Sequence, residues 1–370
     1  MAQQVMHVLS GDLWAGAEVM AHTLLRELVH NSGIEAHAVV LNDGELAARL
    51  RRDDIETTVL DETKLSAWQI FRELKRLAVS QQPQLIHTHR KKENIIGSLV
   101  ARSIGAASLR TVHGWTEFPH LGMNPAKHLS QYLDSLCGRA LQQKIVAVSD
   151  ELRNRLAPEF GSNRICVIEN GVDIERVRNS AARGKVSLPG NHESKRVGIV
   201  ARLVPVKRHD RFVRIAAELL ATSSPDYEFY IVGDGPESAA IDALVTASKH
   251  ADKIHMLGFR EDVLQIINAM DALVVASDHE GIPMNVLEAA ALGVPVVSAP
   301  LASIEAILAS GASGAIATDN SDEALQQAIE KTLTSGKAKP LKALDEKWIF
   351  SARNMAGRYV ELYDQLLDAQ

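Results

Sequence analysis

The sequence predicts an α/β protein with two doubly wound domains, and three observations carry this prediction. The chain has 370 residues, which is long for one α/β domain and comfortable for two. Short apolar runs alternate with amphipathic stretches of helical period, as in parallel sheets covered by helices. This alternation stops at a polar connection, residues 179–195, and then starts again. We therefore expect one domain over residues 1–180 and a second over residues 190–347.

The first domain is expected to hold a parallel sheet that is buried on both faces. Its apolar runs are short and rich in Val and Ile, which is typical of such strands. The predicted strands are Val5–Leu9, Ala36–Leu41, Leu85–His89, Leu109–His113 and Ile145–Val148. The predicted helices between them include Ala17–His30, Ala67–Val79 and Ile95–Ile104.

The second domain repeats this pattern, and a last stretch of helical periodicity, Trp348–Leu367, follows it. Its predicted strands are Val197–Val200, Phe229–Val232, Ile254–Leu257, Ala272–Ala276 and Pro295–Ser298. Ligands of doubly wound sheets bind outside the carboxyl ends of the strands. The chemistry of this protein is therefore expected on the loops that follow the strands.

Composition argues against several classes of protein. Aromatic residues make up 4% of the chain and the net charge is −6, which disfavours binding to nucleic acid. The first residues lack the basic and apolar segments of a signal peptide, and no run approaches the roughly 20 apolar residues of a membrane span. The two cysteines are isolated, as in a reducing cytosol. We expect a cytoplasmic protein, with peripheral docking on the inner membrane face left open.

A polar loop after the fourth strand of the second domain opens a helix at about Pro283. The unpaired N–H groups of Met284 and Asn285 would form an anion site at the helix start, which suits a diphosphate. Glu280 and Glu288 would flank that anion, and carboxylates bind sugar diols well. The alternative is that Glu280 is merely solvated and Glu288 is an ordinary helical residue. Two glutamates without further motifs would favour this alternative.

Arg202 and Lys207 follow the first strand of the second domain. Two cations there would neutralise a diphosphate and the charge that develops on a leaving group, in place of a metal ion. A lone Arg or Lys is more often solvated, and the pairing with Glu280 and Glu288 reverses that preference. The sequence contains no convincing cluster of metal-binding carboxylates, so we expect no metal.

The order of these motifs resembles the retaining glycosyltransferases of family 4, which have the GT-B fold of two Rossmann-like domains. Glu280 and Glu288 match the Glu-x7-Glu motif of that family, and Arg202 and Lys207 match its Arg-x4-Lys pair. Further matches are Glu169–Asp173, Ile231–Pro236, Leu257–Arg260 and Ala15–Glu18. The resemblance implies two domains that face each other across a cleft, and a C-terminal helix over 348–370 that crosses back to the first domain.

The resemblance also implies roles for the charged residues. Arg202 and Lys207 would bind the diphosphate of a nucleotide-sugar donor, which is a substrate, with no cofactor. Glu288 would hold the ribose hydroxyls and Glu280 the hexose hydroxyls.

Four other residues take donor-side roles from the same resemblance. The backbone around Phe259 and Arg260 would meet the nucleobase, and Gly16 would let the backbone approach the phosphate. His113 matches a histidine that lies beside the donor sugar. An isolated structural histidine is the alternative, but the end of a strand followed by Gly114 favours function, with positioning preferred over general-base catalysis.

The acceptor side is less well marked. Arg90 and Lys91 follow a strand and are candidates to contact an anionic, lipid-linked acceptor, while Trp14 and Trp115 are candidates to stack on a sugar. The alternative is a solvated basic loop. The helix Ala67–Val79 combines apolar and basic residues, which suits either an anionic membrane surface or, more often, an ordinary sheet-covering helix.

Together with these motifs, the resemblance implies retaining hexosyl transfer from a UDP- or GDP-sugar to a carbohydrate or lipid-linked acceptor. Enzymes of the resembling family often build cell-surface glycans, so polysaccharide or lipopolysaccharide synthesis is the expected setting. Two alternatives remain. One is a sugar-nucleotide epimerase on the same fold, and the other is a non-catalytic partner that binds a nucleotide sugar in a glycan assembly complex.

Overall fold

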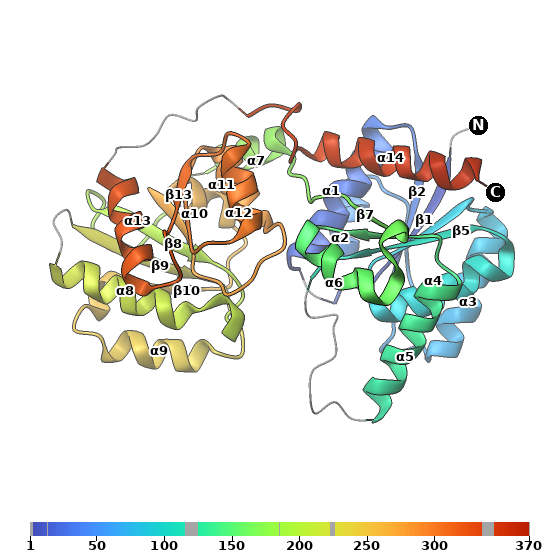
Figure 1. Cartoon of the computed structure of the whole chain (residues 1–370), viewed down its shortest axis with the longest axis horizontal. Helices are drawn as coiled ribbons and strands as arrows, with labels where there is room; N and C mark the ends of the chain where they lie inside the picture. The colour runs from blue at the N-terminus through green and yellow to red at the C-terminus, as the bar shows by residue number, and fades with distance from the viewer. Residues whose placement is uncertain are drawn as a thin grey trace. The chain divides into compact units, whose positions relative to one another are not determined.

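The computed structural model describes residues 3–12, 14–114, 125–184, 186–222, 226–334 and 344–369, with the backbone alone at 125–127. The chain divides into two compact units, Met1–Gly171 with Ala352–Gln370, and Val172–Ser351. Each is a parallel sheet covered by helices, which confirms the predicted α/β fold class (Figure 1). The predicted connection over 179–195 lies inside the second unit, because helix α7 packs there against α10 and α11.

The described residues of the first unit form a seven-stranded parallel sheet in the order β3-β2-β1-β4-β5-β6-β7. The strands are β1 (Gln4–Leu9), β2 (Glu35–Val40), β3 (Thr57–Val59), β4 (Leu85–Thr88), β5 (Ala107–Val112), β6 (Lys144–Ala147) and β7 (Ile165–Val167). The strand order reverses between β1 and β4, so the loops after these two strands lie at the switch point where ligands of such sheets bind.

Helices cover both faces of this sheet. They are α1 (Gly16–Asn31), α2 (Glu45–Arg52), α3 (Ala67–Gln81), α4 (Lys91–Ile104), α5 (Pro125–Ala140), α6 (Asp150–Phe160) and α14 (Ala352–Asp368). Helix α14 belongs to the first unit and packs against α1. It begins at Ala352 and not at Trp348, because the chain from Trp348 to Ser351 forms a turn.

The second unit holds a six-stranded parallel sheet among its described residues, in the order β10-β9-β8-β11-β12-β13. The strands are β8 (Lys195–Val200), β9 (Tyr227–Val232), β10 (Ile254–Gly258), β11 (Ala272–Val275), β12 (Val296–Ser298) and β13 (Gly314–Ile316). The helices are α7 (Ile174–Ala182), α8 (His209–Thr222), α9 (Ser238–Ala247), α10 (Val263–Asn268), α11 (Met284–Leu292), α12 (Ala302–Ala309) and α13 (Asp322–Thr334).

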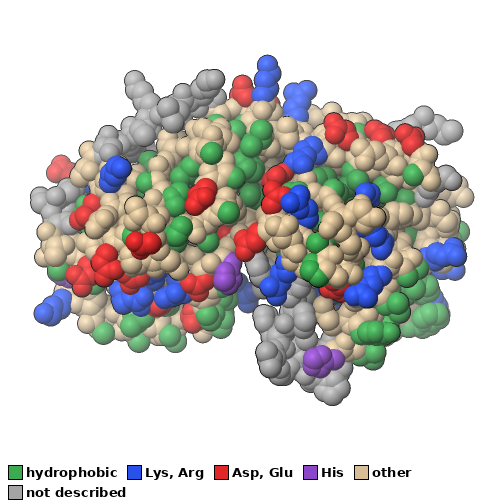
Figure 2. All heavy atoms as spheres, in the orientation of Figure 1, with side chains coloured by type: hydrophobic (Ala, Val, Ile, Leu, Met, Phe, Trp, Pro, Cys, Tyr) green, Lys and Arg blue, Asp and Glu red, His purple; other side chains and the backbone are tan. Residues whose placement is uncertain are grey.

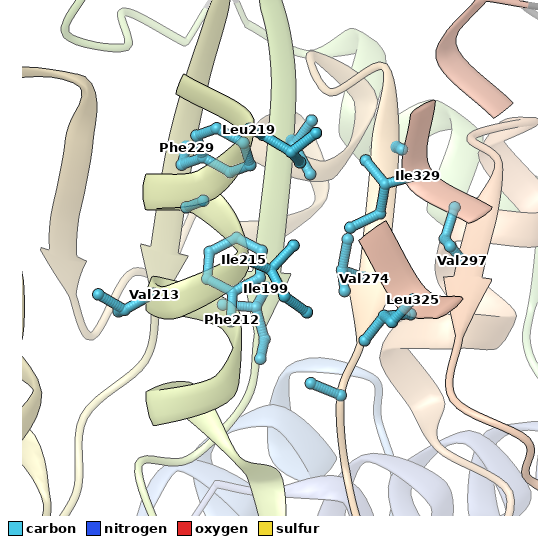
Figure 3. Close-up of a cluster of buried hydrophobic side chains, with 14 of the residues drawn as sticks. Ile199, Phe212, Val213, Ile215, Leu219, Phe229, Val274, Val297, Leu325 and Ile329 are labelled. Carbon is cyan, nitrogen blue, oxygen red and sulfur yellow. The ribbon is translucent and has the colours of Figure 1, made fainter. Parts of the chain in front are cut away.

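A buried apolar cluster fixes α8 and α13 on one face of this sheet (Figure 3). Phe212 and Leu219 of α8 lie in it beside Ile329 of α13, and all three side chains are almost fully buried. Burying a side chain of this size stabilises the fold by about 1.5–3 kcal/mol. The anchored α8 also fixes the end of the loop that precedes it, and that loop carries Arg202 and Lys207.

Candidate functional site

Four loops of the second unit lie at the carboxyl ends of the adjacent strands β10, β9, β8 and β11. Because the strands are parallel, these ends share one edge of the sheet. The loops span residues 259–262, 233–237, 201–208 and 276–283. Together with the start of α11 they carry every residue of this domain that the sequence singles out for donor binding.

The loop after β8 carries two cations in different environments. Arg202 is exposed, and its guanidinium has no partner among the residues that the structure describes. Lys207 is half-buried and ends a short 3-10 helix, Pro205–Lys207. A left-handed residue, Arg208 with a φ of 54°, then turns the chain into α8.

Lys207 forms an ion pair with Glu280 of the loop after β11. Its Nζ donates to Oε1 and Oε2 of Glu280 at 2.6 and 2.7 Å, and the Ser277 hydroxyl donates to Oε1 at 2.7 Å. The Glu280 side chain is 10% exposed and that of Lys207 is 23% exposed, so the pair is poorly solvated. The third proton of the Lys207 ammonium group is left for another acceptor. The structure therefore brings together two residues that lie 73 positions apart in the sequence.

Further bonds hold the same two loops in register. The N–H of Asp278 donates to the carbonyl of Val206 at 2.9 Å, and its carboxylate accepts from Arg208 at 3.0 Å. Asn285 donates from its side chain to the carbonyl of Val200 at 2.6 Å. Its side-chain oxygen accepts the N–H of Val286 at 3.0 Å. The side chain of Asn285 thus ties the start of α11 to the end of β8.

Helix α11 begins at Met284, and Pro283 is the residue just before its first turn rather than the first residue within it. Glu288 lies in the second turn, as predicted. Its side chain is half-buried and has no hydrogen-bond or ion-pair partner within the described ranges. Burial raises the pKa of the Glu288 carboxyl to about 7. A half-buried carboxyl without a partner is ready to accept hydroxyl donors from a ligand.

Glycines let the loop after β9 approach the loop after β8. A Cβ on Gly233, which has a φ of 137°, would lie 2.0 Å from the carbonyl oxygen of Ala201, and a Cβ on Gly235 would lie 2.3 Å from that of Leu203. Only glycine fits both positions. The backbone of Leu203 is also bonded to that of Asp234 at 3.0 Å.

The loop after β10 carries Phe259 and Arg260, to which the family resemblance assigns contact with a nucleobase. Phe259 is 63% exposed, an unusual position for a phenylalanine. The Arg260 guanidinium binds the Asp262 carboxylate through Nε at 2.7 Å and Nη2 at 2.6 Å. This ion pair raises the pKa of Arg260 and lowers that of Asp262. The exposed ring of Phe259 is open to a ligand, whereas the Arg260 guanidinium is already engaged by Asp262.

In the first unit, His113 follows β5 and lies beside His89, which follows β4. Nε2 of His113 is 3.1 Å from Nδ1 of His89, and the two rings stack with centroids 5.3 Å apart. Burial, with a smaller contribution from Arg90, lowers the pKa of His113 to about 3. His113 is therefore neutral at physiological pH and does not bind phosphate as a cation.

The two basic acceptor candidates have partners within the first unit. Arg90 binds Glu18, whose carboxylate is buried, and Lys91 donates to the side-chain oxygen of Gln131 at 2.6 Å. Arg90 also precedes the first residue of α4. A bound acceptor would have to compete with these contacts.

The remaining candidates of the first unit differ in their surroundings. Trp14 lies under the guanidinium of Arg49, 4.4 Å from ring centre to Cζ, so one face of its indole is covered. Gly16 is the first residue of α1, and a Cβ there would meet nothing within 4 Å. Trp115 lies outside the described residues. On α3, Leu74 is buried and Trp68 is 66% exposed.

Sequence reasoning missed two features of these sites. One is Ser277, which helps to hold Glu280 and carries no recognisable motif. The other is a group of histidines behind His113, namely His7, His87 and His89, which are almost fully buried. A signal for two of them was present, because His87 and His89 alternate within the predicted strand Leu85–His89 and would therefore face the same side of the sheet.

Two stretches of the chain match known families. Residues 14–176 match the family described as Glycosyltransferase Family 4, and residues 183–355 match that described as Glycosyl transferases group 1. The matched stretches contain the candidate site residues of both units that are described above. The chain belongs to glycosyltransferase family 4.

Relatives of this family 4 protein include the UDP-Gal:alpha-D-GlcNAc-diphosphoundecaprenol alpha-1,3-galactosyltransferase of Escherichia coli. The two are 28% identical over 232 residues, which covers 60% of this chain and 59% of the length of that relative. The match thus spans less than two thirds of the Escherichia coli enzyme.

Solved structures share the GT-B fold of this family 4 chain. Anabaena Alr3699/HepE in complex with UDP and glucose matches with a TM-score of 0.78 at 18% identity, covering 98% of this chain and 100% of the other. A UDP-N-acetylglucosamine 2-epimerase matches with a TM-score of 0.61 at 16% identity, covering 99% and 97%. At such identities the likeness concerns the fold, which serves more than one chemistry.

Proposed function

We propose that this protein transfers a hexosyl group, with retention at the anomeric carbon, from a UDP-sugar to a carbohydrate or lipid-linked acceptor. The observation that carries the proposal is the charge arrangement in the second unit. Lys207 and Glu280 are paired across two loops. Arg202 lies on the same loop as Lys207, and Glu288 lies on the helix that follows the Glu280 loop; neither side chain has a partner in the described part of the chain. The name of the Escherichia coli relative supports a UDP-linked donor and a diphosphate-lipid acceptor in glycan assembly.

The charges fit the parts of a nucleotide sugar. Arg202 and the third proton of Lys207 neutralise the diphosphate as the bond to the hexose breaks, a contribution that is largest in a poorly solvated site. Glu288 accepts hydroxyl groups of the ribose, and Glu280, already oriented by Lys207 and Ser277, accepts those of the hexose. Because two cations supply the positive charge, we propose that transfer is independent of a metal ion.

His113 takes a positioning role in this proposal. A neutral imidazole whose pKa is held at about 3 is a weak base at physiological pH. The leaving diphosphate then takes part in removing the proton of the acceptor hydroxyl, on the same face of the sugar that it leaves. The alternatives, an epimerase and a non-catalytic binder, differ in products. An epimerase releases a changed sugar nucleotide without an acceptor, and a binder releases nothing new.

The first test is the thermal stability of the protein with UDP, GDP, ADP and their hexose conjugates. A ligand that binds only the folded state adds about 2.7 kcal/mol to the free energy of unfolding at one hundred times its Kd. We expect UDP and one UDP-hexose to raise Tm, and GDP and ADP to leave it unchanged. A response to GDP alone would reassign the donor, and no response to any nucleotide would contradict the proposed site.

We propose that helix α5 docks the enzyme on the membrane that carries its lipid-linked acceptor. Leu129, Tyr132, Leu133 and Leu136 follow the period of one helix face and are all exposed, Leu129 by 59% and Tyr132 by 65%. Figure 2 shows hydrophobic atoms gathered at the lower right, where Figure 1 draws α3, α4 and α5. In the described residues no helix has the length and apolar composition needed to cross a bilayer.

Replacing Leu129 and Leu133 by serine is expected to weaken binding to phospholipid vesicles. Each leucine buried in a bilayer is worth about 1.5–3 kcal/mol, so each change should lower the partition coefficient about tenfold or more. Co-sedimentation with vesicles of zwitterionic and anionic lipid measures this effect. Leu244→Ser, at an exposed leucine of α9, is the matched control and should bind as the wild type does. Equal binding of all variants would contradict the role of α5.

A further inference from the structure

A continuous chain of buried hydrogen-bonding side chains extends from His113 into the first unit. Nε2 of His113 lies 3.1 Å from Nδ1 of His89, and Nε2 of His89 lies 3.1 Å from Nδ1 of His7. Nε2 of His7 lies 3.4 Å from the hydroxyl of Tyr363 on α14. The chain therefore connects the carboxyl end of β5 with the C-terminal helix.

From Tyr363 the chain continues to a closed end. The Tyr363 hydroxyl lies 2.8 Å from Nδ1 of His87, whose Nε2 lies 2.8 Å from the Thr111 hydroxyl. The Thr111 hydroxyl lies 2.8 Å from that of Tyr359. Tyr359 is fully buried, and Thr111 is its one hydrogen-bond partner in the described part of the chain.

The closed end fixes the direction of every hydrogen bond in the chain. A buried hydroxyl proton without an acceptor is costly, and the fully enclosed Tyr359 has Thr111 as its acceptor, so Tyr359 donates to Thr111. The other end of the hydrogen-bond chain, Nδ1 of His113, is also buried. It follows β5 at the carboxyl end of the sheet, however, where a ligand can accept its proton. Thr111 then donates to Nε2 of His87, because that nitrogen is its other partner. A neutral imidazole carries one proton, so His87 holds it on Nδ1 and donates to Tyr363.

The same rule continues through the next two rings. Tyr363 donates to Nε2 of His7, which leaves the His7 proton on Nδ1, where it is donated to His89. His89 in turn holds its proton on Nδ1 and donates to Nε2 of His113. We infer that His89 is a positioning residue that locks His113 in the neutral tautomer with its proton on Nδ1.

All four rings are neutral at physiological pH. Burial lowers the pKa of His7 and His113 to about 3 and places those of His87 and His89 well below the usual range. Arg90, near His89 and His113, acts in the same direction. The one-proton rule therefore holds along the whole chain.

A metal ion is the competing use of this cluster, because one nitrogen each from His7, His87 and His89 lie within 4.8 Å of one another. The hydrogen-bond chain already gives both nitrogens of each of these rings a partner. The structure thus accounts for the cluster without a metal, and a metal would take nitrogens out of the chain.

This inference rests on the proposed function for the ligand that accepts the Nδ1 proton of His113 and for its consequence. With its proton on Nδ1, His113 offers a hydrogen-bond donor to its surroundings and no basic nitrogen, since Nε2 accepts from His89. The ligand group that it suits is an oxygen acceptor, such as a sugar hydroxyl of the donor. The lock therefore supplies a structural reason for a positioning role and excludes general-base catalysis by this ring.

The test is nitrogen NMR of the full chain labelled with 15N-histidine, in which protonated and unprotonated ring nitrogens resonate in separate ranges. The signal of His113 is assigned from its loss in His113→Gln. We expect a protonated Nδ1 and an unprotonated Nε2 for His113 in the wild type. In His89→Leu the donor to Nε2 is gone, so we expect a mixture of tautomers. A protonated Nε2 in the wild type, or a metal bound at one equivalent per chain, would overturn the inference.

Two further variants separate the lock from general damage. His37→Leu removes another buried histidine of the first unit. Nε2 of His37 lies within hydrogen-bond distance of the Thr58 hydroxyl, at 2.9 Å, and His37 does not belong to the hydrogen-bond chain of His113. It should leave the His113 signals unchanged. Tyr363→Phe cuts the chain beyond His7, and the His113 tautomer should persist because His7 still avoids a buried N–H without an acceptor. A changed His113 tautomer in either variant counts against the lock.

Activity measurements distinguish a failure of the lock from a failure of the proposed function. If only the Nδ1 tautomer is competent, kcat of His89→Leu falls in proportion to the fraction of that tautomer, about tenfold when one tenth remains. If the His113 tautomer changes as expected in His89→Leu while kcat is unaltered, the lock is supported and the role of His113 in transfer is overturned.

Discussion

Replacing Lys207 by alanine is expected to lower kcat for hexosyl transfer by about 100- to 1000-fold. Removing one preorganised donor to a developing negative charge has effects of this size. The Lys207 ammonium group is held by both oxygens of Glu280, and this ion pair is poorly solvated. Water in the place of the ammonium group would therefore stabilise the developing charge much less. Steady-state kinetics with a UDP-hexose and its acceptor measure the effect, with Tm recorded alongside.

The control is Lys253→Ala, which removes another lysine of the second unit that is paired with a carboxylate, Asp226. Lys253 precedes β10, away from the carboxyl ends of the strands, and its loss should leave kcat unchanged. Glu280→Gln in the Lys207→Ala background should cost much less than it does alone, because the two residues act as a unit. Wild-type turnover in a folded Lys207→Ala variant would contradict the proposed site.

The sequence predicted the fold well wherever periodicity was strong. Long buried runs such as Val5–Leu9 and Phe229–Val232 became central strands, because burial on both faces leaves little choice of residue. The three-residue edge strands β3, β7 and β13 were not predicted, since so few residues carry little periodic signal. The equally short β12, which lies between two other strands, was predicted from its apolar run. The place of β3, β7 and β13 at sheet edges is set by tertiary pairing rather than local pattern.

The candidate site, like the fold, could be predicted from the sequence only in part. Motif spacing placed Lys207 and Glu280 on the correct loops, but their mutual ion pair depends on how two loops meet. The ion pair between Arg90 and Glu18 could not be predicted either. The sequence of a basic loop does not show whether its charges face solvent or a buried carboxylate. The hydrogen-bonded histidines depend on three strands, the loops after two of them and the C-terminal helix α14 coming together.

The affinity for a UDP-hexose is expected to rise with pH and to level off above pH 7. Burial raises the pKa of the Glu288 carboxyl to about 7 in the free protein, whereas ribose hydroxyls donate best to an ionised carboxylate. Binding then releases the proton, so affinity is lost as pH falls through 7. With this pKa the loss relative to pH 8 is about tenfold at pH 6 and about a hundredfold at pH 5.

Glu288→Gln provides the test, because an amide of the same shape does not titrate. Its affinity at pH 8 should be lower than that of the wild type by about 1–3 kcal/mol, and it should vary much less between pH 5 and pH 8. A UDP-hexose is the suitable probe, because both of its phosphates are fully substituted and keep their charge over this range. Protonation of a nearby histidine would strengthen diphosphate binding at low pH, which is the opposite sign. Titration calorimetry in two buffers of different ionisation enthalpy counts the released proton directly. A wild-type affinity that is flat with pH, or a Glu288→Gln profile that keeps the full slope, would remove Glu288 from the ribose.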